Sequence, residues 1–282
     1  MGTTVKGFNP KYVKRELTRI DKTLLEKIKI YVTGGAVMAL AGLKIGTKDI
    51  DVIVESDRAM NNLVSALLEE RYSTVSGARL LPPYESLSAM VLENKQGFRW
   101  DIFLKIVARK LFLSSGMKKR ATLMFQGRRL IVYSLSKEDI FLLKGVTERD
   151  RDLDDMYILS RSGLSYDVIF KECKHQSRKS GRIWESALFG QCEDLRKKYD
   201  VEIPFLMKLR RLAEEKILQS KILERIQDGS STREAIQRDL KGLLPEDLEF
   251  GLELLVESRQ ITFSDNKITL TSSTKKHQPS SL

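Results

Sequence analysis

The sequence has few of the residues that build disulfide frameworks or zinc sites. Its 282 residues include two histidines and two cysteines, Cys173 and Cys192. Two cysteines do not make a disulfide framework, and no Cys/His spacing in the chain matches a zinc motif. We interpret both cysteines as ordinary thiols in a helical region.

Long apolar runs are also missing. No stretch approaches the roughly 20 apolar residues that a membrane-spanning helix needs. The first residues, MGTTVKGFNPKYVKRE, lack the apolar segment of a secretory signal. With 41% hydrophobic and 31% charged residues, the composition is that of a folded globular protein. We therefore expect a cytoplasmic protein with no membrane partner.

Acidic residues are in short supply over the first three-quarters of the chain. The formal net charge is +11. Residues 1–48 carry +7 and residues 101–148 carry +6, whereas residues 217–282 carry −1. A basic surface favours an anionic partner such as a nucleoside triphosphate or RNA. A solvated basic surface without a partner has the same composition, so charge alone does not decide between them.

The hydrophobic pattern predicts parts with different secondary structure. Strands alternate with helices over residues 1–135, and residues 136–216 are helical. Residues 217–272 indicate three helices followed by two short strands, an order typical of a winged helix. Residues 273–282 have the composition of a disordered tail.

A glycine pair and an aspartate pair stand out in the first part. Gly34 and Gly35 follow a short apolar strand, and Asp49 and Asp51 lie on a later strand. Glycine lets the backbone approach a phosphate closely, and the N-terminus of the following helix, predicted to run to about Leu43, favours negative charge. Side chains alternate along a strand, so the two aspartates share one face about 7 Å apart. Neighbouring carboxylates can share divalent metal ions and repel each other without a cation.

A third carboxylate, Asp101, lies in the apolar segment FRWDIFL. This segment predicts a buried strand, where an aspartate is unfavourable unless it is metal-bound or paired. Nucleotidyl transfer needs backbone N–H groups around the phosphates and clustered carboxylates for divalent metals. Asp101 is therefore the candidate for the third member of such a cluster.

Gly34-Gly35, the gap of thirteen residues, Asp49-Ile50-Asp51 and the distal Asp101 resemble the polymerase-β-like nucleotidyltransferase superfamily over roughly residues 25–135. The resemblance implies an α/β fold with a mixed sheet and transfer of a nucleoside monophosphate to an acceptor hydroxyl. It also implies Mg²⁺, with Mn²⁺ as an alternative: Asp49 and Asp51 would bind both metals, and Asp101 would bind the catalytic metal and help activate the attacking group. Some members of such folds bind nucleotides without turnover. The alternative is therefore a non-catalytic nucleotide-binding regulatory or scaffold protein.

The charged stretch from Lys144 to Asp155 resembles the Lys…Arg-Asp-x-x-Asp segment of abortive-infection (AbiEii-type) toxin nucleotidyltransferases. By that resemblance Lys144 would contact nucleotide phosphates, and Asp152 or Asp155 would order the site or the base. Lys48, next to the aspartate pair, would lie near the phosphates. An antitoxin partner would accompany a toxin-like enzyme. A salt-bridged surface helix has the same charge spacing and is the other interpretation.

The remaining helices bear on the acceptor and on partners. Basic segments within residues 165–216 favour RNA or tRNA as the acceptor, and a protein acceptor is the alternative. Trp184 and Tyr199 would stack on bases or, by default, pack in the core. In the predicted winged helix, carboxylates on the third helix would weaken binding to phosphates, so we expect a protein partner there rather than sequence-specific DNA. These carboxylates are Glu246, Asp247, Glu249, Glu253 and Glu257.

Overall fold

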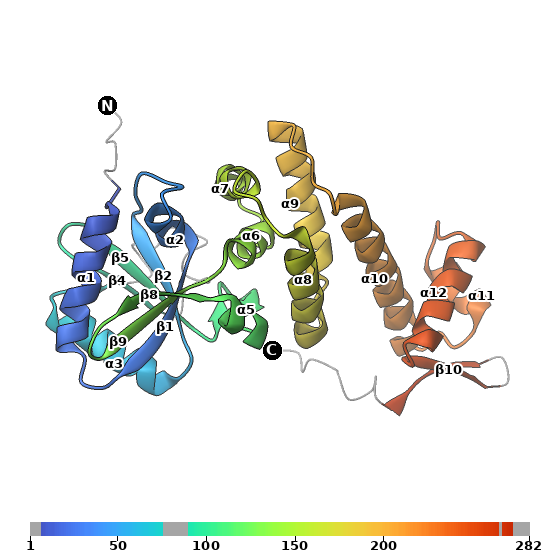
Figure 1. Cartoon of the computed structure of the whole chain (residues 1–282). Helices are drawn as coiled ribbons and strands as arrows, with labels where there is room; N and C mark the ends of the chain where they lie inside the picture. The colour runs from blue at the N-terminus through green and yellow to red at the C-terminus, as the bar shows by residue number, and fades with distance from the viewer. Residues whose placement is uncertain (1–6, 76–89, 265–266, 273–282) are drawn as a thin grey trace. The chain divides into compact units, whose positions relative to one another are not determined.

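The computed structural model describes residues 7–75, 90–264 and 267–272 (Figure 1). The chain divides into two compact units, unit 1 (Met1–Phe205) and unit 2 (Leu206–Leu282). The boundary expected between residues 216 and 217 lies inside the long helix α10 (Leu206–Gln227). No glycine or proline interrupts this helix, so nothing in its sequence ends it at residue 216.

Unit 1 is built on one mixed sheet. Its strands are β1 (Ile28–Thr33), β2 (Asp49–Val54), β3 (Ser73–Thr74), β4 (Met90–Glu93), β5 (Arg99–Leu104), β8 (Thr122–Gln126) and β9 (Leu130–Ser134). They lie in the order β3-β4-β5-β2-β1-β9-β8. β1 pairs with β9 and β2 with β5 in parallel, whereas β1 pairs with β2 antiparallel. The mixed α/β fold expected for this part is confirmed.

Helices connect and cover these strands, and a small ribbon of β6 (Ile106–Val107) and β7 (Leu111–Phe112) follows β5. The helices are α1 (Pro10–Thr23), α2 (Gly34–Leu40), α3 (Asp57–Glu69), α5 (Ser115–Arg120), α6 (Lys137–Gly145), α7 (Asp150–Ser160), α8 (Tyr166–Ser180) and α9 (Trp184–Tyr199). Local sequence sets their ends. Ser56 and Ser136 each accept an N–H of the first turn, as N-cap serines do. α2 ends at Leu40, earlier than expected, because Gly42 adopts the left-handed conformation that closes a helix.

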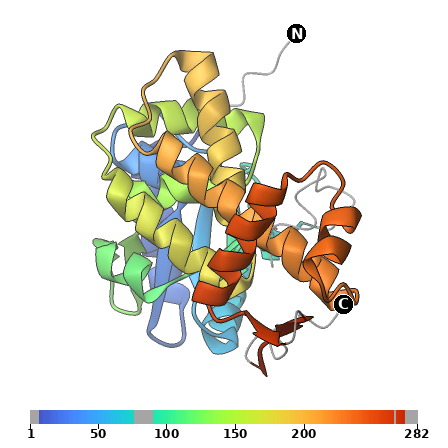
Figure 2. The same ribbon diagram turned by 90° about the vertical axis from the view of Figure 1, so that its right-hand side faces the viewer.

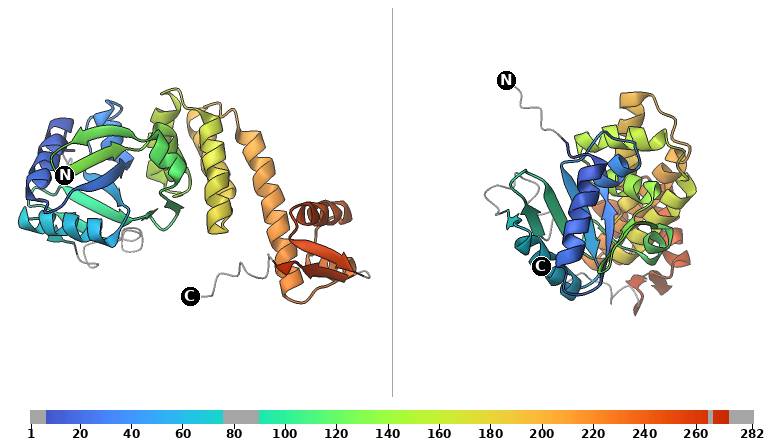
Figure 3. Two further views of the ribbon diagram at one scale, coloured as in Figure 1. Left: turned by 60° about the horizontal axis from the view of Figure 1, so that its bottom comes forward. Right: turned by 60° about the vertical axis from the view of Figure 1, so that its left-hand side comes forward.

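The two faces of the sheet differ. α1 and α3 pack on one face through an apolar core that includes Leu17, Leu63 and Val52. α6 to α9 lie on the other side, as Figure 3 shows. Because strand residues alternate, Asp51 and Asp101 point away from the apolar core and toward the side of α6 and α7. The sheet therefore presents carboxylates to these helices.

The helical part of unit 1 breaks after α8 and after α9. α8 ends at Gly181, which is left-handed, and α9 ends before residue 200. Trp184 is buried and its indole N–H donates to Ser180 Oγ at 3.0 Å, while the ring of Tyr199 stacks on Tyr157 with centroids 4.4 Å apart. Trp184 therefore packs in the core, as the default interpretation expects, whereas Tyr199 is only half-buried. Both cysteines are buried.

Unit 2 follows α10 with α11 (Arg233–Asp239), α12 (Pro245–Glu257) and an antiparallel ribbon of β10 (Ile261–Ser264) and β11 (Lys267–Leu270). α12 lies beside α10, with the ribbon next to α12 (Figure 2). Ile222, Leu252 and Ile268 form the buried core. The five carboxylates of α12 are exposed. The expected tail at 273–282 lies outside the described residues. Within the described part of the chain, no helix has both the length and the apolar character needed to cross a membrane.

Candidate active site

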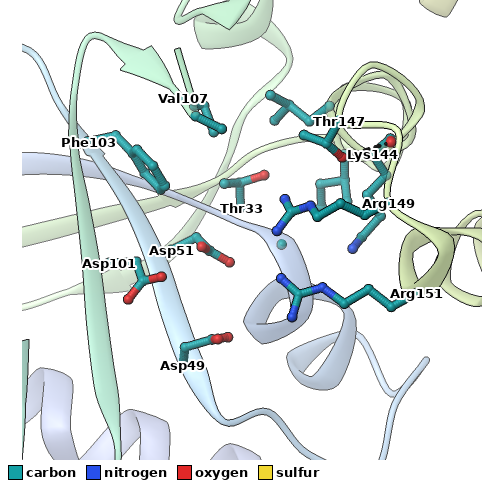
Figure 4. A pocket seen from close by; sticks show the side chains of 14 residues that line it. Thr33, Asp49, Asp51, Asp101, Phe103, Val107, Lys144, Thr147, Arg149 and Arg151 are labelled. Carbon is teal, nitrogen blue, oxygen red and sulfur yellow. Dashed lines mark hydrogen bonds between the residues drawn. The ribbon is translucent and has the colours of Figure 1, made fainter. Parts of the chain in front are cut away.

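The three aspartates meet because of strand register. Asp51 on β2 is paired with Asp101 on the parallel strand β5, and on its other side with Thr33 of β1. Asp49 is two residues earlier on the same face of β2. Figure 4 shows their carboxylates on one side of the strands, close to one another. The sequence-predicted residues of strands β2 and β5 thus share one site.

Gly34 is required by the packing around Asp51. Its φ of 70° is in the left-handed region, which side chains with a Cβ rarely adopt. A Cβ at this position would also collide with the Asp51 carboxylate. Gly34 therefore lets the start of α2 lie directly against the aspartate. Gly35 lines the neighbouring groove.

Burial and mutual repulsion dominate the electrostatics of the three acids. Burial raises the pKa of Asp51 well above its usual range, and the charges of Asp49 and Asp101 raise it further. Burial also raises the pKa of Asp101 to about 7, with a further contribution from Asp49. Lys144 and Arg149 oppose the shift of Asp51. The arrangement therefore attracts additional positive charge.

The donor set suits a hard divalent cation. Three carboxylates on adjacent strands are the ligand type that Mg²⁺ and Mn²⁺ prefer. Asp101 Oδ1 is buried and has no hydrogen-bond partner among the described residues. Within the same residues, no three Asp, Glu, His or Cys side chains already stand in an arrangement that could hold a metal ion.

The second predicted group, Lys144 with Asp152 and Asp155, forms a separate buried cluster. Lys144 Nζ lies 3.0 Å from Asp152 Oδ1 and 2.5 Å from Asp155 Oδ2. Asp152 also accepts a hydrogen bond from Thr147 Oγ1 at 2.7 Å, and Lys44 pairs with Asp155. Burial would lower the pKa of Lys144, but the two aspartates raise it above its ordinary value. The ammonium group is thus held inside the protein by two carboxylates.

Two cavities open around these groups. A small one of about 80 Å³ adjoins Asp51 and Asp101 and is also lined by Phe103 and Ile140. A groove of about 540 Å³ runs from Asp49 past the Lys144 cluster, within the size range of ligand sites. The exposed Lys48 lines this groove, and its expected position near nucleotide phosphates stays a prediction.

The wall of the groove that carries Lys48 is fixed by the N-terminal segment. Phe8 N–H donates to Thr47 O at 2.7 Å, and Thr47 N–H donates back to Phe8 O at 3.0 Å. Thr47 Oγ1 in turn donates to the backbone oxygen of Asp49 at 2.8 Å. Gly7 and Gly46 approach each other so closely that a Cβ on Gly46 would press on backbone atoms. These contacts position residues 44–48 beside the aspartates.

Arg149 and Arg151 were not among the residues predicted for the site, yet both line the cavity and the groove. Their guanidinium groups point from the start of α7 toward the aspartates (Figure 4). Arg149 Nε is 3.1 Å from Asp152 Oδ2. The one signal in the sequence was the presence of two arginines within a charged stretch, which does not reveal where their side chains point.

A glycine pair against a carboxylate-bearing sheet, with basic residues around an adjoining groove, defines a nucleotidyltransferase class of site. A protein-family model described as "Nucleotidyltransferase of unknown function (DUF6036)" matches residues 11–174. The match covers more than half of the chain and includes every residue of the site from Gly34 to Asp155, so the chain belongs to this family of nucleotidyltransferases. A comparison with curated proteins found no match.

Proposed function

We propose that this chain transfers a nucleoside monophosphate from a nucleoside triphosphate to an acceptor hydroxyl in a reaction that depends on Mg²⁺ or Mn²⁺. The observation that carries the proposal is the register of Asp49, Asp51 and Asp101 on two parallel strands beside a basic groove. Membership of a nucleotidyltransferase family supports a nucleotide substrate.

Asp49, Asp51 and Asp101 would hold the metal ions. Bound there, divalent cations stabilise charge on the attacking and leaving oxygens. The acceptor oxygen would form a bond to the α-phosphorus while the bond from that phosphorus to the bridging oxygen breaks, so that pyrophosphate leaves. Asp101 would accept the proton of the acceptor hydroxyl. Gly34 would keep α2 close enough for its backbone to approach the phosphates.

RNA, including tRNA, is the acceptor that the charge of the chain favours. The excess of basic residues falls in unit 1, which contains the site. A protein hydroxyl is the alternative acceptor, and a toxin-like role with an antitoxin partner would follow from the resemblance of residues 144–155.

Unit 2 would be a winged helix that binds a protein rather than DNA. Three helices followed by an antiparallel ribbon support the fold, and the exposed carboxylates of α12 support the choice of partner. A gel-shift experiment with random duplex DNA at low salt tests this, because tight binding that weakens steeply with salt would contradict it.

The enzyme assay uses pure protein, Mg²⁺, each α-labelled nucleoside triphosphate in turn, and total RNA or total protein from the host. We expect label in RNA, and no label with the Asp51→Asn variant. Equal labelling by wild type and Asp51→Asn would overturn the assignment of the site.

The second candidate is a non-catalytic nucleotide-binding regulator on the same fold. One observation favours it: Lys144 and Arg149 already supply positive charge to Asp51 without a metal. This candidate predicts triphosphate binding with no release of pyrophosphate, whichever acceptor is offered.

A further inference from the structure

The basic side chains of the groove are not equally placed to bind a ligand. Lys144 is 12% exposed and its ammonium group lies between Asp152 and Asp155. Lys44 also pairs with Asp155. A lysine neutralised by buried carboxylates contributes little further charge to a ligand in the groove. These two lysines therefore build the wall of the groove.

Arg149 and Arg151 are placed differently. Like Lys144, both line the groove as well as the cavity beside the aspartates, but neither is enclosed between Asp152 and Asp155 as Lys144 is. Their guanidinium groups point toward the aspartates (Figure 4). Arg149 Nε lies 3.1 Å from Asp152 Oδ2 but makes no hydrogen bond within the described residues, so its N–H remains available to a ligand. Planar guanidinium groups bind phosphate oxygens with two parallel hydrogen bonds.

The remaining lining of the groove suits phosphate better than a base. It includes the backbone of Gly7, Gly35 and Gly46, and no aromatic side chain is among the described residues that line it. Without an aromatic ring, the groove offers no stacking surface for a base. Its chemistry therefore selects a chain of phosphates.

We propose that Arg149 and Arg151 contact the phosphates of a polyphosphate ligand in this groove, and that Lys144 is a positioning residue that holds Arg149 through their shared partner Asp152. The proposal rests on the proposed function in one respect, namely that the natural ligand is a nucleoside triphosphate. It follows that the phosphates, and not the base, supply most of the binding free energy.

Binding of inorganic tripolyphosphate in the presence of Mg²⁺, followed by isothermal titration calorimetry on the full chain, tests the proposal. We expect Arg149→Gln and Arg151→Gln each to raise Kd about tenfold and the double variant to raise it about a hundredfold. The Kd of Arg149→Lys should lie between those of wild type and Arg149→Gln. Arg58→Gln is the matched control, because Arg58 is exposed and pairs with Glu26 outside both cavities. Tripolyphosphate should also compete with all four nucleoside triphosphates.

A structural role and a phosphate-binding role are separated by melting temperature. The arginine variants should keep a melting temperature close to that of wild type, while Lys144→Met should lower the melting temperature and weaken tripolyphosphate binding together. Absence of tripolyphosphate binding by wild type, or unchanged Kd in the double arginine variant, would overturn the proposal. Arginine-dependent binding without nucleotidyl transfer would support it and count against the proposed enzyme instead. Nucleotidyl transfer with a KM for the nucleoside triphosphate that is unchanged in both arginine variants would support the proposed enzyme and contradict the role of the arginines.

Discussion

Unit 1 contains two groups of acids with opposite surroundings. Asp152 and Asp155 lie against Lys144, and their charges are neutralised within the protein. Asp49, Asp51 and Asp101 lie on adjacent strands, where burial and mutual repulsion raise the pKa of Asp51 and Asp101. Buried charges are normally paired, so an unpaired group is retained at a cost in stability. We therefore expect the first group to contribute mainly to stability and the second mainly to function.

The largest expected difference between the two groups is in enzyme activity. Asp51→Asn removes one charge from the unpaired group, so nucleotidyl transfer should fall on the order of a thousandfold. The same change relieves repulsion, and the melting temperature of the metal-free protein should rise. Label transfer and thermal unfolding measure the two effects. Glu55→Gln, an acid-to-amide change at the end of β2 in an exposed pair with Lys118, is the control that should alter neither appreciably.

The paired group should show the opposite behaviour. Lys144→Met removes the cation that the two buried carboxylates share and leaves them with Lys44 and Arg149, so it should lower the free energy of unfolding by about 3 kcal/mol, the low end for a broken buried pair. Urea denaturation followed by circular dichroism measures this change. Lys144 is on α6 and its two partners are on α7. A Lys144→Met protein as stable as wild type would contradict the view that this cluster stabilises the contact between the two helices.

A smaller, pH-dependent effect should come from Asp152. Burial raises the pKa of Asp152, but Lys144, Arg149 and Thr147 together lower it by more than burial raises it. The folded-state pKa is therefore below the ordinary value. The stabilisation is therefore present above about pH 4 and is lost as the pH falls through the folded-state pKa. Asp152→Asn should cost about 1 to 3 kcal/mol at pH 7. The difference from wild type should shrink in unfolding curves recorded toward pH 3, and a difference that grows in acid would contradict this account.

The smallest effect is expected at an exposed pair with similar geometry. Lys198 Nζ lies 2.8 Å from Asp154 Oδ1, as close as the buried pair, but both side chains are exposed to water. Exposed ion pairs contribute little because water and salt screen them. Lys198→Met should therefore leave the melting temperature unchanged within error. A loss comparable to that of Lys144→Met would show that burial is not the deciding factor.

The sequence predicted the parts of the site that depend on local pattern. The period of two along a strand placed Asp49 and Asp51 on one face, and an aspartate within an apolar strand pointed to Asp101. Their shared register could not be predicted, because it depends on β2 lying between β1 and β5 in the sheet. The same limit applies to the start of unit 2, since α10 has no local signal at its division from unit 1.

Side-chain direction was the other limit. The spacing of Lys144, Asp152 and Asp155 allowed either a nucleotide site or a salt-bridged helix, and the structure brings them together as a buried ion cluster at the edge of the groove. Whether they also order a nucleotide stays a prediction. Arg149 and Arg151 are plain in the sequence, but that they face the aspartates depends on where the start of α7 lies relative to the sheet.

Titration of the protein with Mn²⁺, followed by electron paramagnetic resonance, tests most directly the claim that the unpaired acids hold a metal. We expect wild type and Glu55→Gln to bind Mn²⁺, with binding lost in Asp51→Asn and competed by Mg²⁺. Absence of binding by wild type, or equal binding by Asp51→Asn, would contradict the claim.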